Sequence, residues 1–129
     1  MILTIKTDQP EAMLALWRDN TEVQKISWHA HRELSSTILI NLEQLLSDNK
    51  LASADLEGIV FFAGPGSFTG LRIGCSLANS LAYAHEIPVM ATHGSSWIQE
   101  GIKALRNGHG QPVVRPDYGR PARITQPRK

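Results

Sequence analysis

The sequence has 129 residues, 42% of them apolar, which suits one domain that buries its core without disulfides or metals. The formal net charge is +1, and the single cysteine, Cys75, excludes an internal disulfide and favours a reducing compartment. No apolar run reaches the roughly eighteen residues that cross a bilayer, and no basic stretch followed by an apolar one opens the chain. We therefore expect a soluble, cytoplasmic protein.

In the first half of the chain the spacing of the apolar residues changes once, from a pattern typical of strands to one typical of a helix. Residues 2–6, 12–18 and 22–28 are rich in apolar and β-branched residues separated by turn formers, which predicts three strands in a meander. Residues 32–48 have a helical period and predict an amphipathic helix of four to five turns. Its apolar stripe consists of Leu34, Ile38, Leu42 and Leu45, widened by Leu39 and Leu46.

The second half alternates between short apolar runs and helical periods. Residues 56–63 form an apolar run without alternation, which is typical of a central strand covered on both faces. A glycine-rich turn follows, then a helical segment at 69–85, a short strand at 88–92 and a last helix at 95–106. The order βββαβαβα predicts an α/β domain with a mixed five-stranded sheet of the ribonuclease-H-like or actin-like architecture.

We expect the domain to cover residues 1–107 and a basic, proline-rich tail to cover residues 108–129. Four prolines forbid regular structure in the tail, which carries five basic residues and one acidic residue, a net charge of +4. Such a segment can attract the phosphates of RNA, but a solvated end is the commoner meaning and the interpretation we favour.

The helix at 69–85 has an unusually wide apolar arc of roughly 200° in helical projection. Within it a strip of small residues recurs at every fourth position, which predicts that another helix approaches closely there: Gly66, Gly70, Gly74, Ala78 and Ala82. We expect this helix to pack both against the helix at 32–48 and against a partner chain.

The turn before this helix contains the most specific string of the sequence: Gly64-Pro65-Gly66-Ser67-Phe68-Thr69-Gly70-Leu71-Arg72-Ile73-Gly74. Amides at the helix start can receive an anion, but the string lacks the lysine of a P-loop and the spacing of a dinucleotide fingerprint. Over all eleven positions it resembles the signature of the TsaB family. The resemblance extends over about residues 1–107, and Pro116-x-Tyr118-x-Arg120 is similar to a motif near the family's carboxyl terminus.

The resemblance implies an actin-like (ASKHA) fold and a short form without most of the family's second domain. It also implies a non-catalytic scaffold that pairs with TsaD for threonylcarbamoyl transfer to adenosine in tRNA. TsaE is a further expected partner, a homodimer is expected when TsaD is absent, and no cofactor, metal or catalytic residue is expected. From the helical arcs we expect a partner interface at Leu34, Ile38, Ile40, Leu71, Gly74, Cys75, Ala78 and Ala82.

Lys6 departs from the pattern of active relatives. Actin-like ATPases, and many TsaB relatives, carry aspartate where Lys6 stands in the first strand, and lysine cannot bind Mg²⁺. This substitution favours the scaffold over the alternative, a nucleotide- or phosphate-binding enzyme that uses the turn at 64–74. A weaker alternative is a tRNA-binding module that acts through the basic tail.

His29, His31 and Cys75 are the remaining candidates for a site. His29 and His31 alternate at a strand end, but two ligands without a third are poor evidence for a metal, and exposed histidines are far commoner there. Cys75 lies on the apolar arc, where burial raises a thiol's pKa rather than activating it. We interpret Cys75 as a small buried helix residue.

Overall fold

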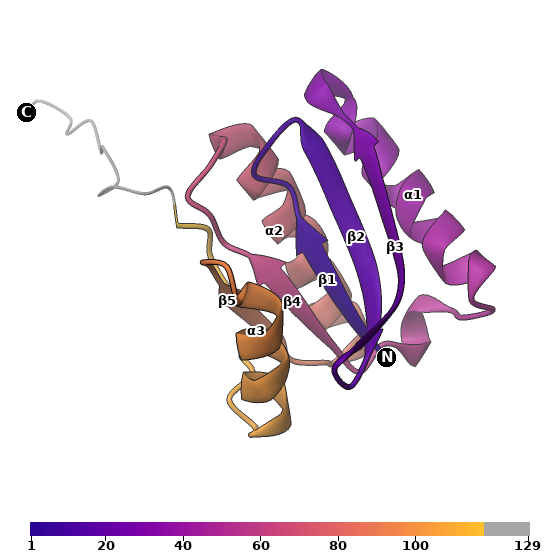
Figure 1. Cartoon of the computed structure of the whole chain (residues 1–129), viewed down its shortest axis with the longest axis vertical. Helices are drawn as coiled ribbons and strands as arrows, with labels where there is room; N and C mark the ends of the chain where they lie inside the picture. The colour runs from indigo at the N-terminus through magenta and orange to yellow at the C-terminus, as the bar shows by residue number, and fades with distance from the viewer. Residues whose placement is uncertain (118–129) are drawn as a thin grey trace, which may run out of the picture.

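The structure is a computed structural model that describes residues 1–117 (Figure 1). The order of elements confirms the predicted βββαβαβα arrangement. Short 3₁₀ turns at His31–Glu33 and Ser53–Asp55 flank the first helix. The strands and helices are β1 (Ile2–Lys6), β2 (Glu11–Arg18), β3 (Thr21–His29), α1 (Leu34–Asp48), β4 (Gly58–Phe62), α2 (Phe68–His85), β5 (Val89–Thr92) and α3 (Trp97–Arg106).

The strands form one mixed sheet in the order β3-β2-β1-β4-β5, which confirms the predicted five-stranded sheet. The hairpin partners β1, β2 and β3 are antiparallel, whereas β1, β4 and β5 run parallel because helical crossovers join them. Leu3 of β1 lies opposite Leu16 of β2 on one side and Ile59 of β4 on the other. The carboxyl ends of the three parallel strands therefore meet at one edge of the sheet.

Helices cover the two faces of the sheet unequally. The helices α1 and α2 lie side by side on one face, and α3 packs mainly on β4 and β5 on the other (Figure 1). Alternating side chains divide accordingly: Ile59 and Phe61 of β4 belong to the core under α1 and α2, whereas Val60 packs with Trp97 and Ile102 of α3. The unbroken apolar run of β4 reflects this burial on both faces.

The helix α2 packs against α1, as predicted, but the glycines of its strip of small residues meet the end of β1 and the ring of Phe61 instead of a helix. Thr7, directly after β1, donates a hydrogen bond from its Oγ1 to the carbonyl oxygen of Gly70 at 2.7 Å. A Cβ on Gly70 would collide with the Thr7 carbonyl oxygen, and one on Gly74 would collide with Thr7 Oγ1 and lie 3.1 Å from the Phe61 ring. The prediction that a helix approaches these glycines is wrong, because the sheet fills that space.

Residues 111–117, which we call the strap, contain no helix or strand but lie against the domain. Gln111 makes an isolated antiparallel bridge with Val89, and Asp117 donates its amide to the carbonyl oxygen of Ala63 at 2.7 Å. Between them, Val114 is buried. Tyr118 and Arg120 of the second motif, with the rest of the basic tail, lie outside the described residues.

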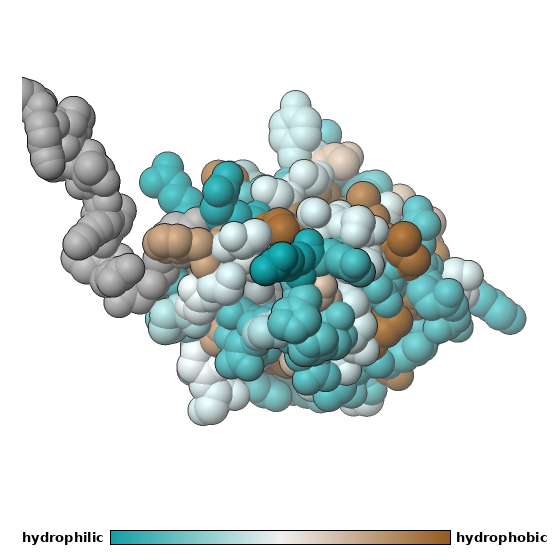
Figure 2. Space-filling model, turned by 90° about the horizontal axis from the view of Figure 1, so that it is seen from above, coloured by the Kyte–Doolittle hydropathy of each residue, from teal (hydrophilic) through white to brown (hydrophobic). Residues whose placement is uncertain are grey.

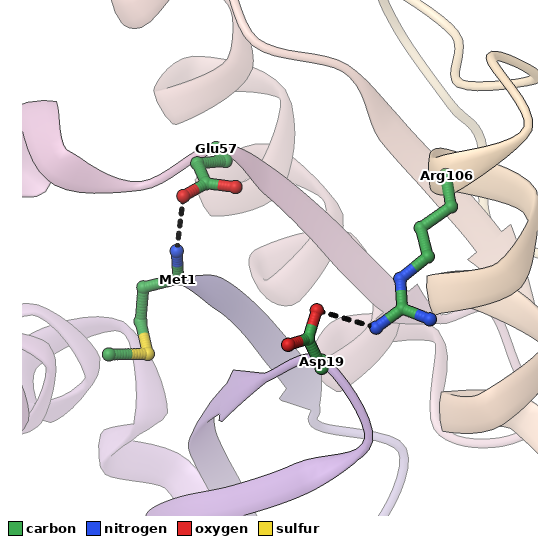
Figure 3. Close-up of polar contacts among 4 residues, drawn as sticks. All are labelled: Met1, Asp19, Glu57 and Arg106. Carbon is green, nitrogen blue, oxygen red and sulfur yellow. Dashed lines mark hydrogen bonds and ion pairs between the residues drawn. The ribbon is translucent and has the colours of Figure 1, made fainter.

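Two ion pairs hold the opposite edge of the sheet (Figure 3). Arg106 at the end of α3 reaches Asp19 in the β2–β3 turn at 2.7 Å, and the amino group of Met1 reaches Glu57 before β4 at 2.9 Å. Asp19 has a left-handed backbone (φ 56°), which aspartate tolerates better than most residues in a tight turn. Across residues 1–117, none of the helices combines the length and apolarity that crossing a membrane requires.

Candidate functional site

The candidate site lies where β1, β4 and β5 end and α2 begins. In α/β sheets this edge is the usual place for ligands, because loops from several strands converge there. Figure 2 views the molecule from this end and shows mainly hydrophilic and neutral residues, with apolar ones scattered among them. The surface therefore offers no broad apolar patch at this edge.

The glycine turn joins β4 to α2 by a close approach to the chain after β1. Gly64 has a positive φ of 109°, which favours glycine, and the Gly64–Pro65 bond is cis. At Gly66 a Cβ would lie 2.8 Å from the carbonyl oxygen of Asp8, so only glycine fits against that segment. The turn is thereby fixed to the end of β1.

Several amides at the start of α2 are used within the chain. Ser67 is the N-cap and accepts a hydrogen bond at its Oγ from the amide of Gly70 at 3.2 Å. The Ser67 amide donates to the carbonyl oxygen of Asp8 at 3.0 Å, and the Leu71 amide donates to the carbonyl oxygen of Ser67 at 2.9 Å. These three donors are unavailable to a bound anion.

Lys6 and Asp8 form an ion pair at the end of β1. Lys6 Nζ donates to Asp8 Oδ1 at 2.7 Å and lies 4.6 Å from the centre of the Phe62 ring. The Asp8 carboxylate is almost completely buried, and the Phe62 ring meets that of Trp97 edge to face. An ammonium group thus neutralises the carboxylate and stacks on an aromatic face, an arrangement that stabilises a cation away from water.

The strap covers the turn from the β5 side. Besides the bond between Asp117 and Ala63, the carbonyl oxygen of Asp117 lies against the α-carbon of Gly64. The carboxylate of Asp117 is 4.0 Å from Nε2 of His93, which follows β5. The sequence contained little signal for this contact, because it joins main-chain atoms more than fifty residues apart.

The histidines near the turn do not assemble a recognisable metal site. The rings of His29 and His31 meet edge to face with centres 4.2 Å apart, and His29 lies opposite Glu11 in the sheet. Within the described part of the chain, no three His, Cys, Asp or Glu side chains are grouped so as to hold a metal ion.

Cys75 is buried in α2, as its place in the apolar arc predicted. Burial raises the pKa of its thiol above the ordinary value, and a hydrogen bond from Asn79 acts in the opposite direction. Its Sγ also donates to the carbonyl oxygen of Val114 at 3.3 Å. The thiol therefore serves packing against the strap, and its environment does not activate it as a nucleophile.

The residues predicted for a partner interface divide into two groups. Ile40 is 65% exposed on α1, whereas the other seven are buried within this chain: Leu34, Ile38, Leu71, Gly74, Cys75, Ala78 and Ala82. The projection missed three large apolar side chains that are exposed on the same helices, Leu39, Phe68 and Tyr83. Leu39, assigned to the buried stripe, is 55% exposed, and Tyr83 of α2 is 86% exposed.

A shallow groove of about 420 Å³ separates the exposed sides of α1 and α2. Its lining combines an apolar residue, Ile73, with four polar ones: Ser35, Thr69, Arg72 and Ser76. These residues offer a partner hydrogen-bonding groups between two helices.

Comparison with known proteins identifies the family. Residues 26–115 match the family model described as "TsaD: tRNA N6-adenosine threonylcarbamoyltransferase". The chain belongs to this family. Similar curated proteins carry the name TsaB, "tRNA threonylcarbamoyladenosine biosynthesis protein", which confirms the resemblance to TsaB.

The TsaB of Bacillus subtilis is 37% identical over 90 residues, which are 70% of this chain and 39% of that protein. The TsaB of Escherichia coli is 34% identical over 92 residues, or 69% and 38% of the two chains. The solved structure of YeaZ from Pseudomonas aeruginosa superposes with a TM-score of 0.68 at 25% identity over 83% of this chain and 49% of that one. The chain therefore spans about two fifths of these curated relatives, and YeaZ confirms the actin-like α/β fold.

In this TsaB family member most residues of the eleven-residue motif make contacts that hold the fold together. Its glycines allow α2 and the turn to contact Thr7 and Asp8, Ser67 caps the helix, and Leu71 enters the core. Only Phe68, Thr69 and Arg72 of the helical part are exposed. The motif thus holds the first strand, the turn and α2 together.

Proposed function

We propose that this chain is a non-catalytic subunit in the synthesis of threonylcarbamoyladenosine on tRNA and pairs with TsaD. Family membership and the names of the TsaB relatives support the pathway. Because the chain spans only part of those relatives, the proposal extends to it the role of the shared domain. A reaction on cytoplasmic tRNA also implies a cytoplasmic location.

The observation that carries the non-catalytic role is the Lys6–Asp8 ion pair. The first strand ends in a lysine whose Nζ is engaged by a buried carboxylate at 2.7 Å, so Asp8 is already neutralised. The capping hydroxyl of Ser67 engages the amide of Gly70, and the carbonyl oxygen of Asp8 engages the amide of Ser67, so two of the amides that could receive a phosphate are occupied. Both features reduce what this edge can offer to Mg²⁺ and a nucleotide.

The partner surface in this proposal is the exposed side of α1 and α2. Leu39 and Ile40 supply adjacent apolar contacts, and the groove lined by Arg72 and Ser76 supplies polar ones. TsaD covers this surface in the complex, and a second copy covers it when TsaD is absent. TsaE joins the TsaD-bound form, while the basic tail beyond residue 107 meets tRNA at most indirectly or through its own charges.

The buried residues of the predicted interface affect the partner surface indirectly, because they fix the positions of α1 and α2 on the sheet. Gly74, Ala78 and Ala82 set how deeply α2 sits on the sheet, and Leu34 and Ile38 do the same for α1. A substitution there shifts the exposed side chains that a partner meets. In this sense the predicted interface residues position the interface without lying on its surface.

Co-purification from the host tests the proposal. We expect the tagged full chain to recover TsaD, and Ile40→Glu to reduce the yield because it places a charge in an apolar contact. The matched control is Lys103→Glu, an exposed change on α3 across the sheet. Equal recovery of TsaD by both variants would contradict the proposed partner surface. Failure of the unmodified chain to recover TsaD would contradict the proposed pairing.

A further inference from the structure

The strap lies in a groove between α2 and the free edge of β5, where it is held largely through its main chain. Gln111 exchanges two hydrogen bonds with Val89, each at 2.8 Å, as in a pair of antiparallel strands. Asn79 of α2 then holds the next contact point: its Nδ2 donates to the carbonyl oxygen of Val114 at 3.0 Å, and its Oδ1 accepts from the Val114 amide at 2.9 Å.

The groove buries the side chain of only one of the strap's two valines. Val114 is 8% exposed and belongs to the core cluster with Cys75 and Ala78, whereas its neighbour Val113 is 59% exposed. A carboxamide that pairs with both polar atoms of one peptide unit imitates a neighbouring strand and is indifferent to the side chain of that unit. The groove thus has the two parts of a strand-recognition site, a main-chain clamp and one apolar pocket.

We propose that this groove is a strand-binding site whose resident ligand is the strap, and that the same segment of a second copy can replace it. The strap follows α3 through Gly108, which has a positive φ of 77°, and Gly110, so a short linker separates it from the last helix. When the strap leaves, the Val89 main chain and the Asn79 amide lose their partners, and an incoming segment with the same main chain restores them.

The test uses the full chain and a fluorescent peptide with the sequence of residues 109–117. The tethered strap competes at an effective concentration of the order of millimolar, so the unmodified chain should bind the peptide weakly. Val114→Asp disfavours the docked strap, because it puts a carboxylate into an apolar pocket. Val113→Asp is the matched control, since it adds the same charge at the exposed neighbour.

We expect the Val114→Asp chain to bind the peptide at least about tenfold more tightly than the Val113→Asp chain. Adding Asn79→Ala to Val114→Asp should weaken binding by about tenfold or more, because the clamp's two hydrogen bonds are lost. Equal affinity of the Val114→Asp and Val113→Asp chains, or no effect of Asn79→Ala, would overturn the proposal.

Hydrogen exchange on the unmodified chain covers the case in which Val114→Asp fails to fold. The amides of Gln111, Val114 and Asp117 should then exchange together and faster than the amide of Val60 in the central strand, because the strap opens without global unfolding. If all four amides exchanged their hydrogens at the rate of global unfolding, the strap would not open separately from the core. That result would contradict replacement of the strap by that of a second copy.

Discussion

The ammonium group of Lys6 lies 2.7 Å from Oδ1 of Asp8, and this pair stands where the first strand meets the glycine turn. Asp8 in turn accepts the Ser67 amide at its carbonyl oxygen, so one residue joins the end of β1 to the start of α2. The first strand of this chain therefore ends in a cation that is paired with a buried carboxylate.

Lys6→Met should lower the free energy of unfolding by about 1–3 kcal/mol, because the Asp8 carboxylate stays buried and loses its charged partner. Methionine keeps an unbranched apolar side chain but loses the ammonium group, and with it both the ion pair and the contact with the Phe62 ring. Urea denaturation measures the loss. Asp8→Asn combined with Lys6→Met should restore part of it, and full additivity of the two changes would show that the pair contributes no coupling energy.

Gly70→Ala and Gly74→Ala should each destabilise the fold by about 1–3 kcal/mol through overpacking against the end of β1. Gly70 should be the more sensitive, since its new Cβ would meet the Thr7 carbonyl, whereas that of Gly74 would meet the Thr7 hydroxyl, which can rotate. The matched controls are Ser76→Ala and Ser80→Ala, because both serines are exposed on the same helix, α2. Thermal unfolding measures the effect, and an equal loss of melting temperature in the serine and the glycine variants would contradict this packing.

The sequence predicted the type and order of the elements because each has a clear period or a continuous apolar run. The eleven-residue motif indicated the turn and the family before any contact was known. Helical projection also identified the small face of α2, but spacing alone cannot say which neighbour uses it. The neighbour is Thr7, sixty-three residues from Gly70 in the chain.

Two parts of the site had weak sequence signals. The prolines after residue 108 predicted irregular structure, but docking of the strap depends on the pairing of Asn79 with Val114, thirty-five residues apart. Leu39 looked like a core residue because it follows Ile38 of the apolar stripe. Its exposure shows that α1 buries a narrower face than its composition suggests.

The stability of the protein should fall above pH 9 more steeply than that of Cys75→Ala. Burial raises the Cys75 pKa in the folded chain above the ordinary value of 9.0, so the unfolded thiol ionises first as the pH rises. The thiol's contribution is thus complete below the unfolded pKa and is lost as the pH rises through the folded pKa. Urea unfolding from pH 7 to 10.5 measures both slopes, and parallel curves would contradict the burial.

Leu39→Glu should weaken binding to TsaD by about tenfold or more while changing the free energy of unfolding by less than about 0.5 kcal/mol, because the side chain is already exposed. Calorimetric titration and urea denaturation of the same sample separate the two effects. A loss of affinity that tracks a loss of stability would instead assign Leu39 to the core.

Titration of the purified full chain with TsaD and, separately, with ATP and Mg²⁺ tests the central claim most directly. We expect a stable complex with TsaD, no heat from ATP, and no phosphate release by the chain alone or after Lys6→Asp, since one carboxylate does not supply the missing phosphate contacts. Binding and hydrolysis of ATP without any affinity for TsaD would contradict the scaffold and identify the chain as a nucleotide-binding enzyme.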